Sequence, residues 1–332
     1  MLRHILILVA GMFIMANAGA SCTLKRGHST VLTIPTETIM ISADAAVDTS
    51  KPIVQYDSSK LSANIGYDDC TNGTAFGGNT TDLNSSNGGL FATNIPGISA
   101  KLLVFYNASR SDTIPFEKHM QFSGGEGTGT ADFNAGFFYR VEFYKTSANL
   151  GLSSSPDSNN IVLGTGERAY FYVITPSPSS SDLKLNIGEI KIYSTPSCTI
   201  DKTKNIDFGI VTKKDLTSSG IERNLDFNLT CKTDYGSYSA TASISATDPS
   251  SDSQYITVKD ATGKNNSLGI KISDSKDQPM LVNGTSTEIK NNINSNTPAQ
   301  FNWKAKLIPI DGASQPTSGK FTAQAEIILQ VK

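Results

Sequence analysis

Short apolar runs, separated by polar stretches that contain glycine, characterise the chain between Cys22 and Tyr193. Within Val141–Phe143 and Ile190–Ile192 the apolar side chains stand two residues apart. This period places every second side chain on the same face of a β-strand. The predicted strands are Val31–Ile34, Ile39–Ile41, Lys101–Tyr106, Tyr139–Tyr144, Ala169–Ile174 and Ile187–Tyr193. Six or more such strands favour a β-sandwich.

The composition favours an all-β chain with two domains. Ser, Thr, Asn and Gly are abundant beside short β-branched and aromatic runs, and this mixture is typical of strands and turns. About 310 residues exceed what one ordinary domain holds, so two domains of about 150–175 residues are expected. We expect an N-terminal domain over residues 21–194, a linker over 195–197 and a C-terminal domain over 198–332, both built as β-sandwiches.

The first twenty residues have the pattern of a secretory signal peptide. Arg3 precedes the apolar run Ile5–Met15, and small residues follow. A transmembrane anchor needs about 20 apolar residues, whereas this run is shorter and ends at Asn17. The pattern predicts cleavage after Ala20 or Ala18. No later segment is long and apolar enough to span a membrane, so we expect an exported, soluble protein.

Charge and motifs argue against nucleic-acid binding and catalysis. Removing residues 1–20 changes the net charge from -2 to -3, whereas nucleic-acid binding calls for a basic face. The chain has no Gly-x-Ser-x-Gly elbow, and no Lys-Ser/Thr pair follows Gly124–Gly129. Carboxylates such as Asp68, Asp69 and Glu126 cannot be paired across space from sequence. We therefore predict no enzyme and no cofactor, with an extracellular sandwich-fold enzyme as the alternative.

The cysteine count predicts disulfide bonds. The four cysteines are Cys22, Cys70, Cys198 and Cys231. In an oxidising compartment an even number implies two disulfides, and three pairings are possible. Clustering favours one bond in each half, Cys22–Cys70 and Cys198–Cys231. A zinc site is the competing interpretation, but the spacing has no CxxC and only His28 and His119 follow the leader, so no metal is predicted.

Two segments of the N-terminal half are too polar to be core, Thr71–Asp82 and Thr175–Asp182. Loops with many short hydrogen-bonding side chains on a rigid sandwich can bind sugars, whose hydroxyls need donors and acceptors. Solvated loops without a ligand are the alternative. Phe76 is the aromatic residue expected to be exposed in the first segment. Trp303, the only tryptophan, is expected in the core of the C-terminal half.

The last residues carry the longest alternation in the chain. From Phe321 to Val331 one face holds apolar residues only, namely Phe321, Ala323, Ala325, Ile327, Leu329 and Val331. Together with earlier blocks, this makes the chain from Cys198 onward similar to a chaperone–usher pilin domain. The earlier blocks are Cys198–Asp201, Ile206–Val211, Gly220, Leu225–Cys231 and Asn266–Ile272. Pilins usually carry an aromatic residue in the penultimate place, where this chain has Val331.

The resemblance implies an incomplete immunoglobulin-like sandwich that lacks its final strand. Such an edge needs a partner, because buried backbone donors and acceptors must be paired. In the family, a periplasmic chaperone and then the next pilus subunit each add a strand, and an outer-membrane usher assembles the fibre. The resemblance assigns the alternating face from Phe321 to Val331 to this groove.

The position in the fibre follows from the resemblance and the leader together. A shaft pilin carries an apolar extension before its first cysteine and donates it to a neighbour. Here cleavage after Ala20 leaves only Ser21 before Cys22, so the chain would accept a strand but have none to give. A terminal subunit with an extra domain in front resembles a two-domain tip adhesin, a virulence protein at the tip of a surface fimbrium.

The type 1 fimbrial adhesin, which the chain resembles in layout, binds host glycan at the end remote from its pilin domain. Its pocket uses the loop after the second cysteine, a loop before the last strand and the free N terminus. By position the candidates here are Ser21, Asn72, Thr74, Asn79, Asp82, Ser179, Ser181 and Asp182, and Asp68 and Asp69 are further acceptors. A tip subunit that binds protein or metal, or that only initiates the fibre, remains an alternative.

Overall fold

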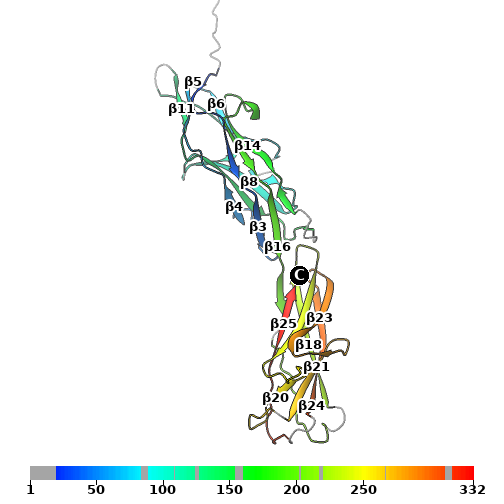
Figure 1. Cartoon of the computed structure of the whole chain (residues 1–332). Coiled ribbons are helices and arrows are strands. Elements are labelled where there is room, and N and C mark those ends of the chain that lie inside the picture. Colours follow the sequence, from blue (N-terminus) through cyan, green and yellow to red (C-terminus); the bar gives the residue numbers. More distant parts are fainter. Residues whose placement is uncertain are drawn as a thin grey trace, which may run out of the picture.

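The structure is a computed structural model, and it describes residues 20–83, 89–107, 109–123, 127–153, 160–201, 203–216, 220–265, 267–310 and 316–332. The predicted signal peptide falls almost entirely on residues 1–19, outside the described part. Two β-rich bodies lie end to end, and the C terminus lies near the junction between them (Figure 1). Within the described ranges, no helix has the length and apolar character needed to cross a membrane.

Four sheets build the N-terminal body. The first, in the order β1–β5–β11, contains β1 (Thr23–Arg26), β5 (Ile65–Thr71) and β11 (Thr128–Phe133). The second, in the order β10–β6–β14–β15–β2, contains β10 (Phe116–His119), β6 (Ala75–Thr80), β14 (Gly166–Val173), β15 (Leu183–Ile187) and β2 (Thr30–Ile34). A 3-10 turn, η2 (Pro178–Ser180), precedes β15.

The other two sheets of this body continue toward the junction. One, in the order β4–β12–β8–β7 with β9 also on β8, contains β4 (Val54–Asp57), β12 (Phe138–Lys145), β8 (Ile98–Phe105), β7 (Phe91–Ala92) and β9 (Ser111–Ile114). The other, in the order β13–β16–β3, contains β13 (Ile161–Leu163), β16 (Ile190–Thr195) and β3 (Glu37–Ser42).

The segment Ile187–Tyr193, predicted as one strand, is divided between two sheets. β15 ends at Ile187 and pairs in parallel with β2, whereas β16 begins at Ile190 and pairs in parallel with β3. The break falls at Gly188, where a Cβ atom would lie 2.5 Å from the backbone nitrogen of Thr36. Only glycine fits against the neighbouring backbone there. The segment between β2 and β3 and the segment between β15 and β16 therefore pass from one sheet to the next side by side.

Two sheets build the C-terminal body. One, in the order β17–β18–β24–β21–β20 with β22 on β21, contains β17 (Ser197–Ile200), β18 (Ile221–Lys232), β24 (Pro298–Pro309), β21 (Leu268–Ser273), β20 (Ile256–Val258) and β22 (Pro279–Met280). The other, in the order β23–β19–β25, contains β23 (Asn283–Asn294), β19 (Ser237–Ala246) and β25 (Ala325–Val331). The all-β prediction is confirmed.

Each body has its own hydrophobic core. In the N-terminal body Phe171 contacts a group of aromatic rings and is almost fully buried. In the C-terminal body Trp303 is fully buried and packs edge-on against Phe227 with ring centroids 4.9 Å apart, which confirms its predicted place in the core. The disulfides are Cys22–Cys70 and Cys198–Cys231, the pairing favoured by clustering.

The connection between the bodies is shorter than the linker expected over residues 195–197. Thr195 ends β16 and Ser197 begins β17, so only Pro196 lies between the two strands.

Candidate functional site

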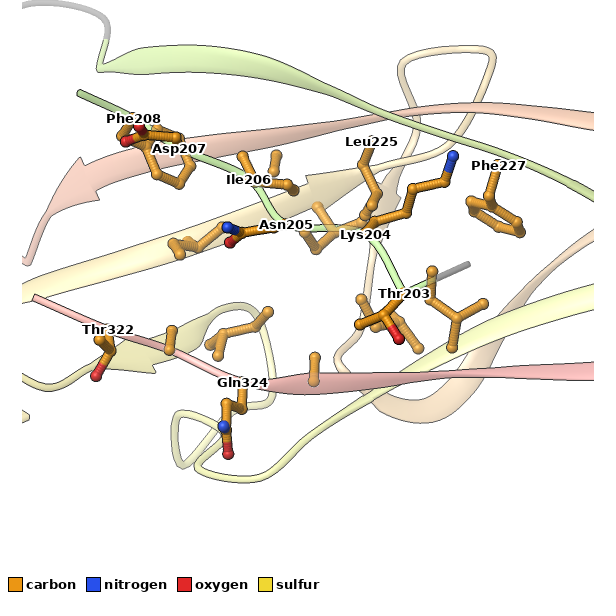
Figure 2. A pocket seen from close by; sticks show the side chains of 18 of the residues that line it. Thr203, Lys204, Asn205, Ile206, Asp207, Phe208, Leu225, Phe227, Thr322 and Gln324 are labelled. Atoms are coloured by element: carbon orange, nitrogen blue, oxygen red, sulfur yellow. The ribbon is translucent and has the colours of Figure 1, made fainter. Parts of the chain in front are cut away.

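A groove of about 710 Å³ lies in the C-terminal body. Figure 2 shows the segment Thr203–Phe208 along one side and Thr322 and Gln324 along the other. The second side continues into β25, whose Ala325, Ile327 and Leu329 also line the groove.

The floor of the groove is apolar. Leu225 and Phe227 of β18 and Ile244 of β19 lie there, each with less than a tenth of its surface exposed. The rim is polar, because Lys204 pairs with Asp201 at 3.2 Å and Lys320 lines the opposite side. An apolar floor between polar rims suits a strand whose apolar side chains point inward and whose polar side chains point outward.

One edge of β25 is open. The N–H and C=O groups of Lys332 and Ser239 bond each other at 3.0 and 2.8 Å, and Thr247 N–H donates to the Gln324 carbonyl at 3.1 Å. In an antiparallel ladder only alternate residues bond a given neighbour. The backbone groups facing away from β19 therefore belong to Ala325, Ile327, Leu329 and Val331. Among the described residues no strand pairs with this edge.

On the opposite side of the groove, the pilin-like block Ile206–Val211 forms no strand. β17 pairs with β18 only as far as Ile200, and Asp201 then bonds Asn228 through both its N–H group and its side chain. Beyond this point the chain leaves the sheet, and Ile206–Val211 pairs with no strand in the described part. This segment therefore lines the groove without belonging to either sheet.

The alternating C-terminal residues lie where the groove is. Five of them line it: Phe321, Ala323, Ala325, Ile327 and Leu329. Val331 packs against the same core but lies beyond the lining. On the opposing side, Ile206–Phe208 were identified from sequence only as part of a pilin-like block, and Thr203–Asn205 were not identified, because the segment shows no continuous alternation.

A second candidate site lies at the end of the N-terminal body remote from the junction, beside β5, β6 and β11 (Figure 1). Ser21 donates from its backbone N–H to Thr71 Oγ1 at 3.1 Å and from its hydroxyl to the Asp69 carbonyl at 3.1 Å. Its own carbonyl accepts from the buried Thr74 hydroxyl at 3.2 Å. Asn72 Oδ1 accepts from the Phe122 N–H at 2.6 Å. The structure therefore brings Ser21, Asp69, Asn72 and Thr74 together.

The second polar segment reaches the same β5 strand through Asp182. Its carboxylate accepts a short hydrogen bond from the Tyr67 hydroxyl. Burial, and then this hydrogen bond, raise the pKa of Tyr67 well above its usual value. Ser181 is buried and donates to the Pro178 carbonyl at 2.9 Å, whereas Ser179 is exposed beside Ser177 at 2.8 Å.

The segment Thr71–Asp82 is not one loop. Residues 75–80 form β6, and Gly77 and Gly78 let β10 pack closely, because a Cβ on Gly77 would lie 2.1 Å from the Phe116 carbonyl oxygen. The six-residue β6, ~20 Å long, separates Asn79 and Asp82 from the Ser21 cluster. Asp82 pairs with Arg168 at that other end.

Phe76 and Asp68, both named from the sequence, make contacts within the N-terminal body. Phe76 was expected to be exposed, but it packs against the core and stacks on Phe171, with ring centroids 6.2 Å apart. Asp68 pairs with Arg26 at 3.5 Å, and Arg26 also bonds Asp132 at 2.8 Å. Arg26 and Asp132 were not identified from sequence, because strands β1 and β11 bring them together from distant positions.

Comparison with known proteins supports the assignment of the C-terminal half. The sequence profile of the family described as fimbrial protein matches residues 185–332. A comparison with curated proteins gave no match. This match includes the whole C-terminal body and the end of the N-terminal one, and it identifies the C-terminal body as a pilin-type domain.

Solved structures are similar to the chain at low identity. The receptor-binding domain of the adhesin MrkD1P of Klebsiella pneumoniae is 21% identical, covers 55% of this chain and 99% of its own, and gives a TM-score of 0.38. The CupB6 tip adhesin of Pseudomonas aeruginosa is 13% identical, covers 93% of both chains, and gives 0.38. A chain of the CsuC–CsuE chaperone–tip adhesion subunit complex of Acinetobacter baumannii is 12% identical, covers 94% of this chain and 100% of its own, and gives a TM-score of 0.37.

Proposed function

We propose that this chain is the tip adhesin of a chaperone–usher fimbria. The observation that carries the proposal is the open edge of β25 beside an apolar groove in a pilin domain. A strand added there would pair with the free backbone groups of Ala325, Ile327, Leu329 and Val331 and fill the floor with its own apolar side chains. A periplasmic chaperone, and after it the next subunit, are the proposed donors, with an usher guiding assembly.

The start of the N-terminal domain supports a terminal position in the fibre. β1 pairs with β5 of the same domain, and the adjacent Cys22 is bonded to Cys70. This segment is therefore already used within its own sheet and is not available to complete a neighbouring subunit.

The N-terminal domain is the proposed receptor-binding part, and a host glycan is the proposed ligand. The cluster around Ser21, Asn72 and Thr74 offers hydroxyl and amide groups, and Asp182 adds a carboxylate that is bonded to Tyr67 of the adjoining β5. Sugar hydroxyls both donate and accept hydrogen bonds, so a mixed set of this kind suits them. Asp68, Asp69, Ser179 and Ser181 remain candidates for the same site, whereas Asn79 and Asp82 would need a separate one.

The strand-accepting role can be tested with a short synthetic peptide in which valine and threonine alternate. Titration into the full chain should give saturable binding and raise the unfolding temperature, because a ligand that binds only the folded state stabilises it. Ile327→Asp should weaken binding strongly, since it places a charge in the apolar groove. The exposed neighbour Ile328→Asp is the matched control. Equal binding by both variants would contradict the role.

The receptor role can be tested on a glycan array with the full chain. Asn72→Ala and Asp182→Ala should each reduce binding, while Asp226→Ala, an exposed carboxylate on β18 of the pilin domain, should not. Binding that survives both N-terminal changes would reject this site. Absence of any glycan signal, with intact binding of cells, would favour a protein receptor.

A further inference from the structure

A turn of the pilin domain enters the base of the N-terminal domain. The turn comprises residues 233–236 and connects β18 to β19. Asp234 at its tip is 4% exposed, although it is a charged residue between two domains. Charged side chains are rarely this buried unless their oxygens have partners.

Asp234 has partners for all three of its oxygen atoms, and each partner belongs to the N-terminal domain. One carboxylate oxygen accepts from the Leu150 N–H at 2.9 Å, and the other accepts from the Ser194 hydroxyl at 2.6 Å. The Asp234 carbonyl accepts from the Leu152 N–H at 3.1 Å. One residue therefore connects two separate segments of the other domain, the 150–152 loop and the end of β16.

Tyr235 adds an apolar contact to this polar one. Its hydroxyl accepts from the Ser194 N–H at 3.0 Å, and its ring packs against the hydrophobic core of the N-terminal domain. Residues next to each other in the turn thus make the polar and the apolar part of one contact.

The turn is also fixed to its own domain. The Thr233 N–H donates to Ser295 Oγ at 2.9 Å, and the Ser295 N–H donates to the Gly236 carbonyl at 2.9 Å. Within the turn, the Tyr235 N–H donates to Thr233 Oγ1 at 3.2 Å. The shape of the turn is therefore fixed by contacts within the pilin domain, independently of its contacts with the N-terminal domain.

Further hydrogen bonds connect the two domains at the periphery of the junction. Lys232 Nζ donates to the Ala148 carbonyl at 3.2 Å, and the Ser197 hydroxyl donates to Asp44 at 2.7 Å. Lys145 is fully buried close by, and burial lowers its pKa although the carboxylates of Asp234 and Asp44 favour its charge. With Pro196 as the only residue between β16 and β17, no flexible linker separates the two domains.

We infer that the 233–236 turn locks the two domains into one rigid body, with Asp234 as the positioning residue. Domains joined by a short connection move relative to one another by default unless their interface prevents it. Here any relative rotation would separate the buried Asp234 oxygens from their donors, and unpaired buried polar groups are unfavourable. A pull on the N-terminal domain would then reach the pilin domain without a hinge. This inference does not depend on the proposed receptor or strand donor.

NMR spectroscopy of the full chain tests the lock in two ways. We expect one shared rotational correlation time for both domains, and slow exchange of the Leu150, Leu152 and Ser194 amides, whose partners lie across the junction. Asp234→Ala should give the domains separate correlation times and remove protection at Leu150 and Leu152. Asp226→Ala, an exposed aspartate of the same domain, should change neither.

Tyr235→Phe keeps the ring but removes the acceptor for the Ser194 amide, so it tests the inference even if Asp234→Ala does not fold. Exchange at Ser194 should rise, while the exposed Tyr193→Phe leaves it unchanged. Independent tumbling of the two unaltered domains, unprotected junction amides, or a Tyr235→Phe variant with unchanged Ser194 exchange would each overturn the inference.

Discussion

The two halves of this chain differ in how their terminal strands are paired. In the N-terminal domain four sheets share one core, and the first strand, β1, is paired within its own domain. In the pilin domain the last strand, β25, has one paired edge among the described residues and faces a groove of about 710 Å³. Both halves bury large aromatic residues, so the difference lies in backbone pairing and not in the presence of a core. An unpaired edge over an apolar floor is open to pairing with a further strand.

The largest effect should come from removing that edge strand. Deleting Ile327–Lys332 takes most of β25 from its three-stranded sheet and uncovers the core beneath it. We expect the pilin domain not to fold and the chain to be degraded in the periplasm without forming a chaperone complex. Chaperone co-purification and periplasmic yield measure this. An unchanged yield of the complex would contradict the assignment of β25.

Replacing one buried phenylalanine by alanine in each core should distinguish the two domains. Phe171→Ala and Phe227→Ala each remove a buried ring, and each should lower the free energy of unfolding of its domain by ~3–5 kcal/mol. Phe227 also lines the groove, so its loss should weaken binding of the alternating Val/Thr peptide as well. Denaturant unfolding and peptide titration of the full chain measure both quantities. Equal peptide affinity in the two variants would show that Phe227 is not part of the groove floor.

A smaller effect is expected at Glu288, a buried carboxylate of the pilin domain. It accepts from Trp303 Nε1 at 2.6 Å and pairs with Lys290 at 2.7 Å. Glu288→Ala leaves the indole N–H unpaired and should lower the free energy of unfolding by ~1–3 kcal/mol. Glu288→Gln, which keeps an acceptor, should lower it less. Urea unfolding of both variants measures the difference, and identical values would refute the role of this hydrogen bond.

The pH dependence of Glu288 follows from its contacts. Burial raises the pKa of this carboxyl, but hydrogen bonds from Lys290, Trp303 and Ser275 outweigh burial and lower it. A lowered folded-state pKa stabilises the protein above the unfolded pKa of about 4.3, and this contribution is lost as the pH falls through the folded value. Glu288→Gln should therefore reduce the loss of stability in acid. If the free energy of unfolding fell equally in acid for Glu288→Gln and the unaltered chain, the lowered pKa of Glu288 would be contradicted.

The smallest effect is expected from a surface ion pair of the N-terminal domain. Arg140 Nε lies 2.6 Å from Asp57 Oδ1, and the hydrogen bond to Asp57 raises the pKa of Arg140. Exposed pairs of this kind usually contribute ~0–1 kcal/mol, so Asp57→Asn should change the free energy of unfolding by less than about 1 kcal/mol. A larger loss in denaturant unfolding would show that the pair is more important than its exposure indicates.

Strands could be predicted wherever alternation was long. β12 and β25 follow from apolar residues two apart, β8 follows from a short apolar run, and the buried Trp303 follows from its apolar neighbours. The prediction failed where glycine had a tertiary role. Gly77 and Gly78 made β6 look like part of a loop, whereas they permit close packing of β10, and Gly188 interrupts a continuous apolar pattern. Close approach of distant backbones leaves no local signal.

The candidate sites show the same limit. One side of the groove was predictable because β25 alternates, but the opposite side, Thr203–Phe208, has no regular pattern and is recognised only in space. At the far end, Ser21 and Thr74 were predicted by position and do meet, whereas Asn79 and Asp82 were separated from them by β6. The junction residue Asp234 gave no signal in the sequence, because its partners Leu150 and Ser194 are distant along the chain.

Amide hydrogen exchange along β25, with and without the alternating Val/Thr peptide, tests the central claim most directly. The amides of Ala325, Ile327, Leu329 and Val331 face the open edge, whereas those of Glu326, Ile328 and Gln330 face β19. The first set should exchange fast in the free chain and become protected when the peptide is bound, while the second set changes little. Protection of the first set in a peptide-free monomer, or no protection on binding, would contradict the claim that this domain borrows a strand.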